Sequence, residues 1–137
     1  SGSNKNPDYY FIVKLNGKYG LQKMKDNAYF LKPEYDKITF VKDKHNNNRL
    51  ITLTKQNQHF VVLPSTNTLL KIPFDEVLSF DDELAVVKQK TNYGIYNFTQ
   101  NKYIRKLSSE PIISGEHPYE YYIKNLQKNC YQAIRAK

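Results

Sequence analysis

One stretch of nine residues occurs twice in this chain of 137 residues. Residues 13–21 (VKLNGKYGL) recur without a gap, 74 positions later, as residues 87–95 (VKQKTNYGI). Self-similarity at a fixed offset is typical of repeat proteins, in which each repeat is one small supersecondary structure that packs on its neighbours. This recurrence constrains the fold more strongly than any other feature of the sequence, and it predicts an array of similar elements.

The first repeat is expected to consist of short antiparallel strands. Its opening segment is rich in aromatic and β-branched residues, which favour strands. Asn16-Gly17 follows it, and both residue types tolerate the positive φ angles of a tight type I′ hairpin. The expected strands are residues 9–14, 19–23, 28–31 and 34–40.

Two further repeats echo this pattern less faithfully. The predicted fold is therefore mainly β, with three degenerate repeats of roughly 35–40 residues each. They cover residues 9–42, 49–80 and 83–108 of a β-repeat domain that extends from 9 to 115. Residues 1–8 begin with Ser1-Gly2-Ser3, which reads like a cloning scar, and we expect a tag remnant and a disordered start there.

The C-terminal segment, residues 116–137, is expected to be an amphipathic helix. Pro118 is a favourable first helical residue, and apolar residues follow it at intervals of three or four. We expect this helix to cap the repeats and cover an edge strand, and the alternative is a helix that binds a partner. The apolar positions are Tyr119, Tyr122, Ile123, Leu126, Cys130 and Ile134, and this placement makes Cys130 a buried, inert thiol.

The order of the motifs resembles the bacterial WG-repeat (KWG-type) family. A strand is followed by Gly-Lys-Tyr-Gly-Leu, a variable turn and Lys-Pro-Glu-Tyr-Asp-Lys-Ile, with Tyr in place of the signature Trp. The resemblance implies small β-repeats that serve as binding or scaffolding modules, often in envelope-associated or exported bacterial proteins, without a shared catalytic centre. The matching positions are Gly17, Tyr19, Gly20, Pro33, Tyr35, Asp36, Pro73, Phe74, Asp75, Tyr93 and Gly94.

The spacing of the histidines and the cysteine argues against a metal site. His45, His59 and His117 are far apart in the sequence, and Cys130 is the only cysteine. Zinc sites draw on ligands a few residues apart, and that spacing is missing here. Phosphate-binding glycine loops and serine nucleophile elbows are missing as well. We therefore expect neither a cofactor nor a metal.

The carboxylates do not indicate catalysis either. Pairs occur at Glu34/Asp36 and Asp75/Glu76, and a glycosidase needs two carboxylates flanking a bond. However, Asp36 and Asp75 occupy equivalent repeat positions. A repeated Asp after an aromatic residue is more simply explained as a turn former that bonds its own backbone. The chain is therefore predicted not to be an enzyme.

Positive charge is concentrated in the third repeat. The net charge is +8, and residues 84–108 contain five basic and no acidic residues. Basic residues interleaved with tyrosines could hold an anionic polymer, although a solvated lysine surface explains the same pattern. The candidate binding residues are Lys88, Lys90, Tyr93, Tyr96, Lys102, Tyr103, Arg105 and Lys106.

Two hypotheses about function remain. The first is a non-enzymatic β-repeat module that mediates protein–protein interaction in a bacterial envelope-associated or secreted system. The alternative is a binder of nucleic acid or acidic glycan that uses the basic third repeat. The direction of the tyrosine side chains separates the two, because rings that point inward leave no platform for stacking. No apolar run reaches the roughly 20 residues needed to span a bilayer.

Overall fold

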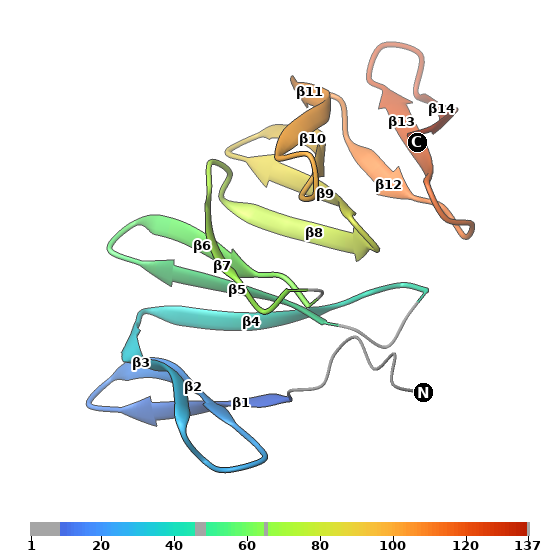
Figure 1. Cartoon of the computed structure of the whole chain (residues 1–137). Helices are drawn as coiled ribbons and strands as arrows, with labels where there is room; N and C mark the ends of the chain where they lie inside the picture. The colour runs from blue at the N-terminus through green and yellow to red at the C-terminus, as the bar shows by residue number, and fades with distance from the viewer. Residues whose placement is uncertain (1–8, 46–48, 65, 137) are drawn as a thin grey trace, which may run out of the picture. The chain divides into compact units, whose positions relative to one another are not determined.

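The described part of the chain, residues 9–45, 49–64 and 66–136, consists of short antiparallel strands in the computed structural model (Figure 1). The predicted tag remnant at residues 1–8 lies outside it. Its strands are β1 (Tyr10–Leu15), β2 (Lys18–Lys23), β3 (Tyr29–Tyr35), β4 (Lys37–Lys42), β5 (Arg49–Lys55), β6 (Gln58–Val62), β7 (Leu69–Ile72), β8 (Glu76–Asp81), β9 (Leu84–Gln89), β10 (Asn92–Asn97), β11 (Lys102–Ser108), β12 (Ile112–Ser114), β13 (Glu120–Asn125) and β14 (Cys130–Arg135).

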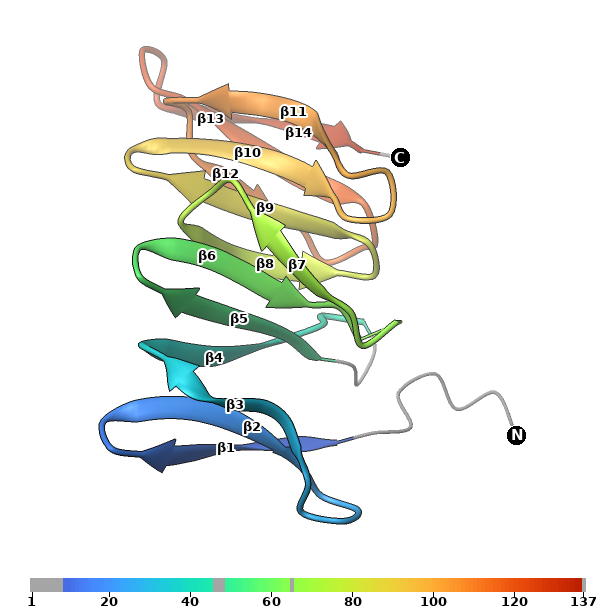
Figure 2. The same cartoon turned by 60° about the vertical axis from the view of Figure 1, so that its left-hand side comes forward.

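The strands form four sheets, in each of which neighbours in sequence are neighbours in space (Figure 2). Their orders are β1-β2-β3, β4-β5-β6-β7, β8-β9-β10-β11 and β12-β13-β14. The chain divides into two compact units, an N-terminal unit of residues 1–40 with 48–73 and a C-terminal unit of residues 41–47 with 74–137. Among the described residues there is no helix that is long and apolar enough to cross a membrane.

The prediction of a mainly β fold is confirmed, but the prediction of a C-terminal helix is wrong. Residues 120–135 form the β13–β14 hairpin instead. Tyr121 and Ile123 are buried, whereas Tyr122 between them is only partly buried, which is the two-residue period of a strand. The tyrosines and isoleucine satisfy both periods, so the helical spacing alone misleads. Cys130 is exposed at the start of β14, so the prediction of a buried thiol is wrong as well.

Local hydrogen bonds favour the hairpin over a helix at Asn125. Its side-chain oxygen accepts hydrogen bonds from the backbone N–H groups of Gln127 (3.0 Å) and Lys128 (2.9 Å). Asn129 then adopts a φ of 52°. Asn residues compete with helical hydrogen bonding in this way and accept left-handed backbone, and the chain therefore turns here.

Two repeated glycines are needed for close backbone approach. A Cβ on Gly20 would lie 2.6 Å from the Leu31 carbonyl oxygen, and one on Gly94 would lie 2.9 Å from that of Arg105. At both positions the register of the pairing shifts, because the third strand of the repeat bulges over the glycine. Phe60 occupies the corresponding position of the second repeat, and β6 and β7 pair there without a bulge. The Tyr-Gly motif is thus tied to a β-bulge.

The repeated aspartates connect the first strand of a sheet to its tight hairpin. The Asp36 N–H donates to the Thr54 carbonyl (2.8 Å), and the Asp36 carboxylate accepts from the Gln56 N–H (3.0 Å). Asp75 makes the same pair of bonds with Lys88 (3.0 Å) and Lys90 (2.9 Å).

The predicted partner of the repeated Asp was its own backbone. The observed partner is a turn residue 20 or 15 positions later in the sequence. Gln56 and Lys90 both have positive φ, so each bond secures a turn in an unfavourable backbone conformation.

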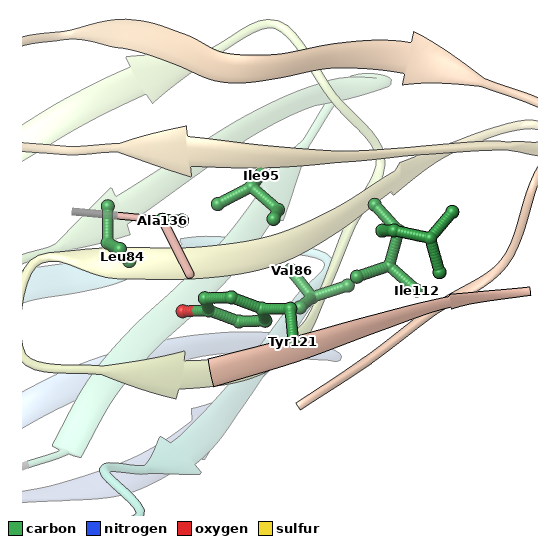
Figure 3. Close-up of a cluster of buried hydrophobic side chains, with 7 residues drawn as sticks. Leu84, Val86, Ile95, Ile112, Tyr121 and Ala136 are labelled. Carbon is green, nitrogen blue, oxygen red and sulfur yellow. The ribbon is translucent and has the colours of Figure 1, made fainter. Parts of the chain in front are cut away.

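Each unit has an apolar cluster between its sheets. In the C-terminal unit the cluster joins β9 and β10 to the β12-β13-β14 sheet (Figure 3). Its buried members are Leu84, Val86, Ile95, Ile112, Tyr121, Ile123 and Ala136. Burying a large apolar side chain contributes about 1.5–3 kcal/mol. In the N-terminal unit the buried members are Leu21, Tyr35, Ile38, Ile51, Leu53 and Val62.

We expect Gly94→Ala to destabilise the protein by about 1–3 kcal/mol, because the added methyl group meets backbone that cannot move independently. Chemical denaturation followed by circular dichroism measures this loss. Gly17→Asn is the matched control, since a Cβ there meets nothing within 4 Å and Asn57 has a positive φ of 64° in the equivalent turn. We expect the control to cost less than Gly94→Ala, because Asn meets no atom there and tolerates left-handed backbone better than other side chains do. Equal effects of the two substitutions would contradict this role of Gly94.

Candidate interaction surface

The β12-β13-β14 sheet has one buried and one open face. Ile112, Tyr121 and Ile123 are at most 5% exposed and face the apolar cluster. Ile113 pairs with Tyr122, which in turn pairs with Ala133 on β14. Because directly opposed residues of antiparallel strands share a face, these three side chains form a row across the open side.

The open side exposes large apolar side chains that are close together. Ile113 is 48% exposed and Tyr131 is 51% exposed, and both line a shallow apolar depression with Tyr122. Ile113, Tyr122, Tyr131 and Ala133 are hereafter called the outer face. Tyr131 pairs with Lys124, and Arg135 pairs with Glu120, which places charged residues beside the apolar row. Single exposed apolar residues are ordinary, but a contiguous group marks a candidate interaction site.

A polar groove continues from the outer face toward the loop before β13. Ile113 and Tyr122 line it together with Lys44, Ser114, Gly115, Glu116, His117 and Glu120. The Lys44 ammonium donates a hydrogen bond to the Gly115 carbonyl (2.6 Å). A Cβ on Gly115 would lie 2.5 Å from a Glu120 carboxylate oxygen, so the loop passes close to β13.

His45 also holds this loop. Its Nδ1 lies 2.9 Å from Asp81 Oδ1, and its Nε2 lies 2.7 Å from the Glu116 carbonyl oxygen. A carbonyl only accepts, so Nε2 carries a proton, and a second proton on Nδ1 suits the carboxylate. These two acceptors, the carbonyl first, raise the pKa of His45 above its ordinary value. We call His45, Asp81 and Glu116 the histidine clasp.

Tyr119 adds to the histidine clasp. Its backbone N–H donates to the second Asp81 oxygen (3.3 Å), and its hydroxyl donates to Asp82 (3.0 Å). The hydrogen bond to Asp82 raises the pKa of the Tyr119 hydroxyl to about 12. The start of β13 is therefore held by both carboxylates of the β8–β9 turn.

Asp43, His45 and Asp81 are a group that could hold a metal ion, since one ligand atom from each lies within 4.8 Å of the others. The spacing of His and Cys in the sequence does not indicate this group, because an isolated bridge between Asp43 and Phe80 brings it together. The Asp43 oxygens accept hydrogen bonds from the N–H groups of His45 (2.9 Å) and Asp82 (2.7 Å). With the Asp81 oxygens also bonded, the arrangement suits a hydrogen-bonded clasp.

The predicted basic residues lie on two strands and one turn of a single sheet. Lys88 lies on β9 and Lys90 in the β9–β10 turn, whereas Lys102, Arg105 and Lys106 lie on β11. The Lys88 ammonium lies 5.4 Å from the centre of the Tyr93 ring. Arg105 forms an ion pair with Glu110 (3.4 Å).

Two of the predicted stacking rings belong to an internal aromatic group. The Tyr96 and Tyr103 ring centres are 5.1 Å apart, and they lie 5.1 and 6.4 Å from that of Phe74, which is fully buried. Burial raises the pKa of both tyrosines. Tyr93 packs against the apolar cluster of the C-terminal unit. The rings therefore stabilise the fold at these positions.

The outer face was not predicted from the sequence, because Tyr122 was expected on a helix and Ile113 and Tyr131 were not among the candidate residues. The two-residue alternation at Tyr121–Ile123 and the Asn-rich turn at 125–129 were signals that could have indicated the hairpin.

We expect the stabilisation by the histidine clasp to depend on pH. Because the folded state raises the pKa of His45, this contribution is complete below the ordinary imidazole value of about 6.5 and is lost as pH rises through the folded pKa. The difference in Tm between the wild type and His45→Gln should be larger near about pH 5.5 than near about pH 8.5. Thermal unfolding at both pH values tests this, with the exposed His117→Gln as the control. A difference that grows with pH would contradict the clasp.

Comparisons of the chain with protein-family models, with curated proteins and with solved structures found no match.

Proposed function

We propose that this chain is a non-enzymatic binding module that engages a protein partner through its outer face. The observation that carries the proposal is the exposure of Ile113 (48%) and Tyr131 (51%) beside Tyr122, on a sheet whose other face is buried. Each unit already has an apolar cluster, so these side chains are not needed to fill one. Tyrosines are enriched at interfaces because a large ring and a polar tip serve apolar and hydrogen-bonding contacts together.

The charges around the outer face indicate the chemistry of the partner. Lys124 and Arg135 lie beside the apolar row and Lys44 lines the adjoining groove, while Glu120, which pairs with Arg135, and Glu116 carry negative charge there. A protein segment with apolar side chains at its centre and a carboxylate placed beside Lys124 complements this surface. The resemblance to WG repeats supports a scaffolding role in a bacterial envelope-associated or secreted system.

The geometry favours this function over catalysis. The titratable groups of the histidine clasp already hold one another and the backbone of the loop. It supports the loop before β13, from which the groove residues Glu116 and His117 project. A rigid support under an exposed surface preorganises binding, because less conformational entropy is lost on association.

Replacing outer-face residues should weaken partner binding without unfolding the protein. We expect Ile113→Asp and Tyr131→Asp each to reduce partner capture at least about tenfold, because binding would bury an unpaired carboxylate against apolar groups. Quantitative affinity capture from an extract of the source organism compares them with Leu78→Asp, a β8 residue that is 42% exposed. Equal capture by the wild type and both outer-face variants would refute the proposed surface.

The anionic-polymer alternative has its own test. With Tyr96 and Tyr103 packed on Phe74, lysine charge remains as the main attraction for a polyanion. We expect no mobility shift of single-stranded DNA at about 200 mM salt and at most a diffuse one at about 50 mM. A discrete complex that persists at the higher salt concentration would favour the alternative.

A further inference from the structure

The β12-β13-β14 sheet corresponds to a four-stranded sheet whose last strand is missing from the described residues. In the two four-stranded sheets, Thr54 of β5 and Lys88 of β9 each form a backbone hydrogen bond with the residue that precedes the first strand, Asp36 or Asp75. Lys124 of β13 does the same, because its N–H donates to the Pro111 carbonyl (3.0 Å). β14 is therefore equivalent to β6 and β10, which pair with the fourth strands β7 and β11. Among the described residues, β14 is therefore an edge strand of this sheet, and β12 is the other.

The β14 edge also lacks the usual protection. Edge strands discourage pairing with other chains by charged residues, by proline or by shortness. β12 is only three residues long, and β14 contains no lysine, proline or acidic residue, with its one charge at its last position, Arg135. The other edge strands carry Lys14 (β1), Lys32 and Pro33 (β3), Lys37 and Lys42 (β4), Lys71 (β7), Glu76 and Asp81 (β8), and Lys102, Arg105 and Lys106 (β11).

The hydrogen-bond pattern identifies which β14 amides point away from β13. On β13, the Glu120 carbonyl accepts a hydrogen bond from the Gly115 N–H, and the Lys124 N–H donates to the Pro111 carbonyl. Both groups therefore point toward β12. The Ala136 N–H bonds the Tyr119 carbonyl, on the β14 side. Because antiparallel pairs alternate, the backbone groups of Tyr131, Ala133 and Arg135, which pair with Lys124, Tyr122 and Glu120, point to the open edge.

We infer that β14 pairs with β14 of a second copy of this chain, antiparallel and centred on Ala133. The outward amides then fall in register, since Ala133 faces its own copy and Tyr131 faces Arg135 of the partner subunit. Both Tyr131–Arg135 pairs bring a guanidinium beside an aromatic ring on the same face of the joined sheet. No two like charges of β14 face each other, because Arg135 is its only charged residue.

The joined sheet would extend the outer face of both copies. The row Ile113–Tyr122–Ala133 continues across the symmetry axis into the same row of the second copy. Each chain carries a net charge of +8, so long-range repulsion opposes association. The dimer should therefore tighten with added salt, as counterions screen that repulsion.

Analytical ultracentrifugation over a range of concentrations tests the pairing. We expect a monomer–dimer equilibrium for the wild type that Ala133→Pro weakens at least about tenfold, because proline removes the two central N–H donors of the interface. The Ala133 N–H points away from β13, so the hairpin keeps its own bonds. Ala133→Lys should have the same effect by placing two ammonium groups side by side. Ile104→Lys, at a 39% exposed position on β11, should leave the equilibrium unchanged.

The single exposed cysteine reports the register directly. In the proposed pairing, Cys130 lies opposite residue 136 of the other copy, so the two Cys130 Cα atoms are separated by roughly 20 Å along the strands. Pulsed electron paramagnetic resonance on nitroxide labels at Cys130 should therefore give a short inter-label distance. The flexible label tethers broaden the distance distribution. A monomer at millimolar concentration, a dimer unaffected by both Ala133 variants, or a distance beyond about 40 Å would each overturn the inference.

The two tests separate this inference from the proposed function. Ile113→Asp changes the outer face and leaves the β14 backbone unaltered. Loss of partner capture with an intact dimer therefore supports both proposals. Retained capture by the Ile113 variant together with an intact dimer overturns only the proposed function.

Discussion

In each four-stranded sheet, the hydrogen bonds of a repeated aspartate connect the first strand to the hairpin of the second and third strands. Asp36 and Asp75 each donate through the backbone and accept through the carboxylate, and both bonds reach the hairpin formed by the second and third strands. They fix the register of the first strand and support a turn residue at positive φ. The preceding aromatic residue, Tyr35 or Phe74, is thereby held in the core.

The C-terminal sheet departs from this arrangement in a way that accounts for its surface. Pro111 faces Lys124 where the other sheets have an aspartate, and proline offers neither an N–H nor a carboxylate. The β13–β14 hairpin correspondingly has a four-residue loop closed by Asn125, with Leu126 exposed. Its support comes instead from the histidine clasp and from Lys44, which hold the loop between β12 and β13. The outer face is thus displayed on a sheet anchored at the opposite end from its hairpin.

Much of the β architecture could be predicted from local signals. Asn16-Gly17 specifies a turn because both residues accept positive φ, and both have it. The glycine of the Tyr-Gly motif lies opposite a bulged strand that no local pattern describes. The C-terminal helix was wrong because Tyr119–Ile134 contains apolar residues at both helical and strand spacing. Whether a tyrosine faces inward depends on the sheet opposite it, which the spacing does not encode.

The sequence by itself determined the repeats, the tight turns and the mainly β fold, because these follow from the φ preferences and side-chain alternation of adjacent residues. The tertiary structure decided which residues are available for function. Tyr96 and Tyr103 were turned toward Phe74, and Asp43, His45 and Asp81 were gathered from distant positions. Ile113, Tyr122 and Tyr131 were brought onto one open face. The physical reason is that strand pairing sets the neighbours of each side chain across the sheet, and these neighbours are remote in the sequence.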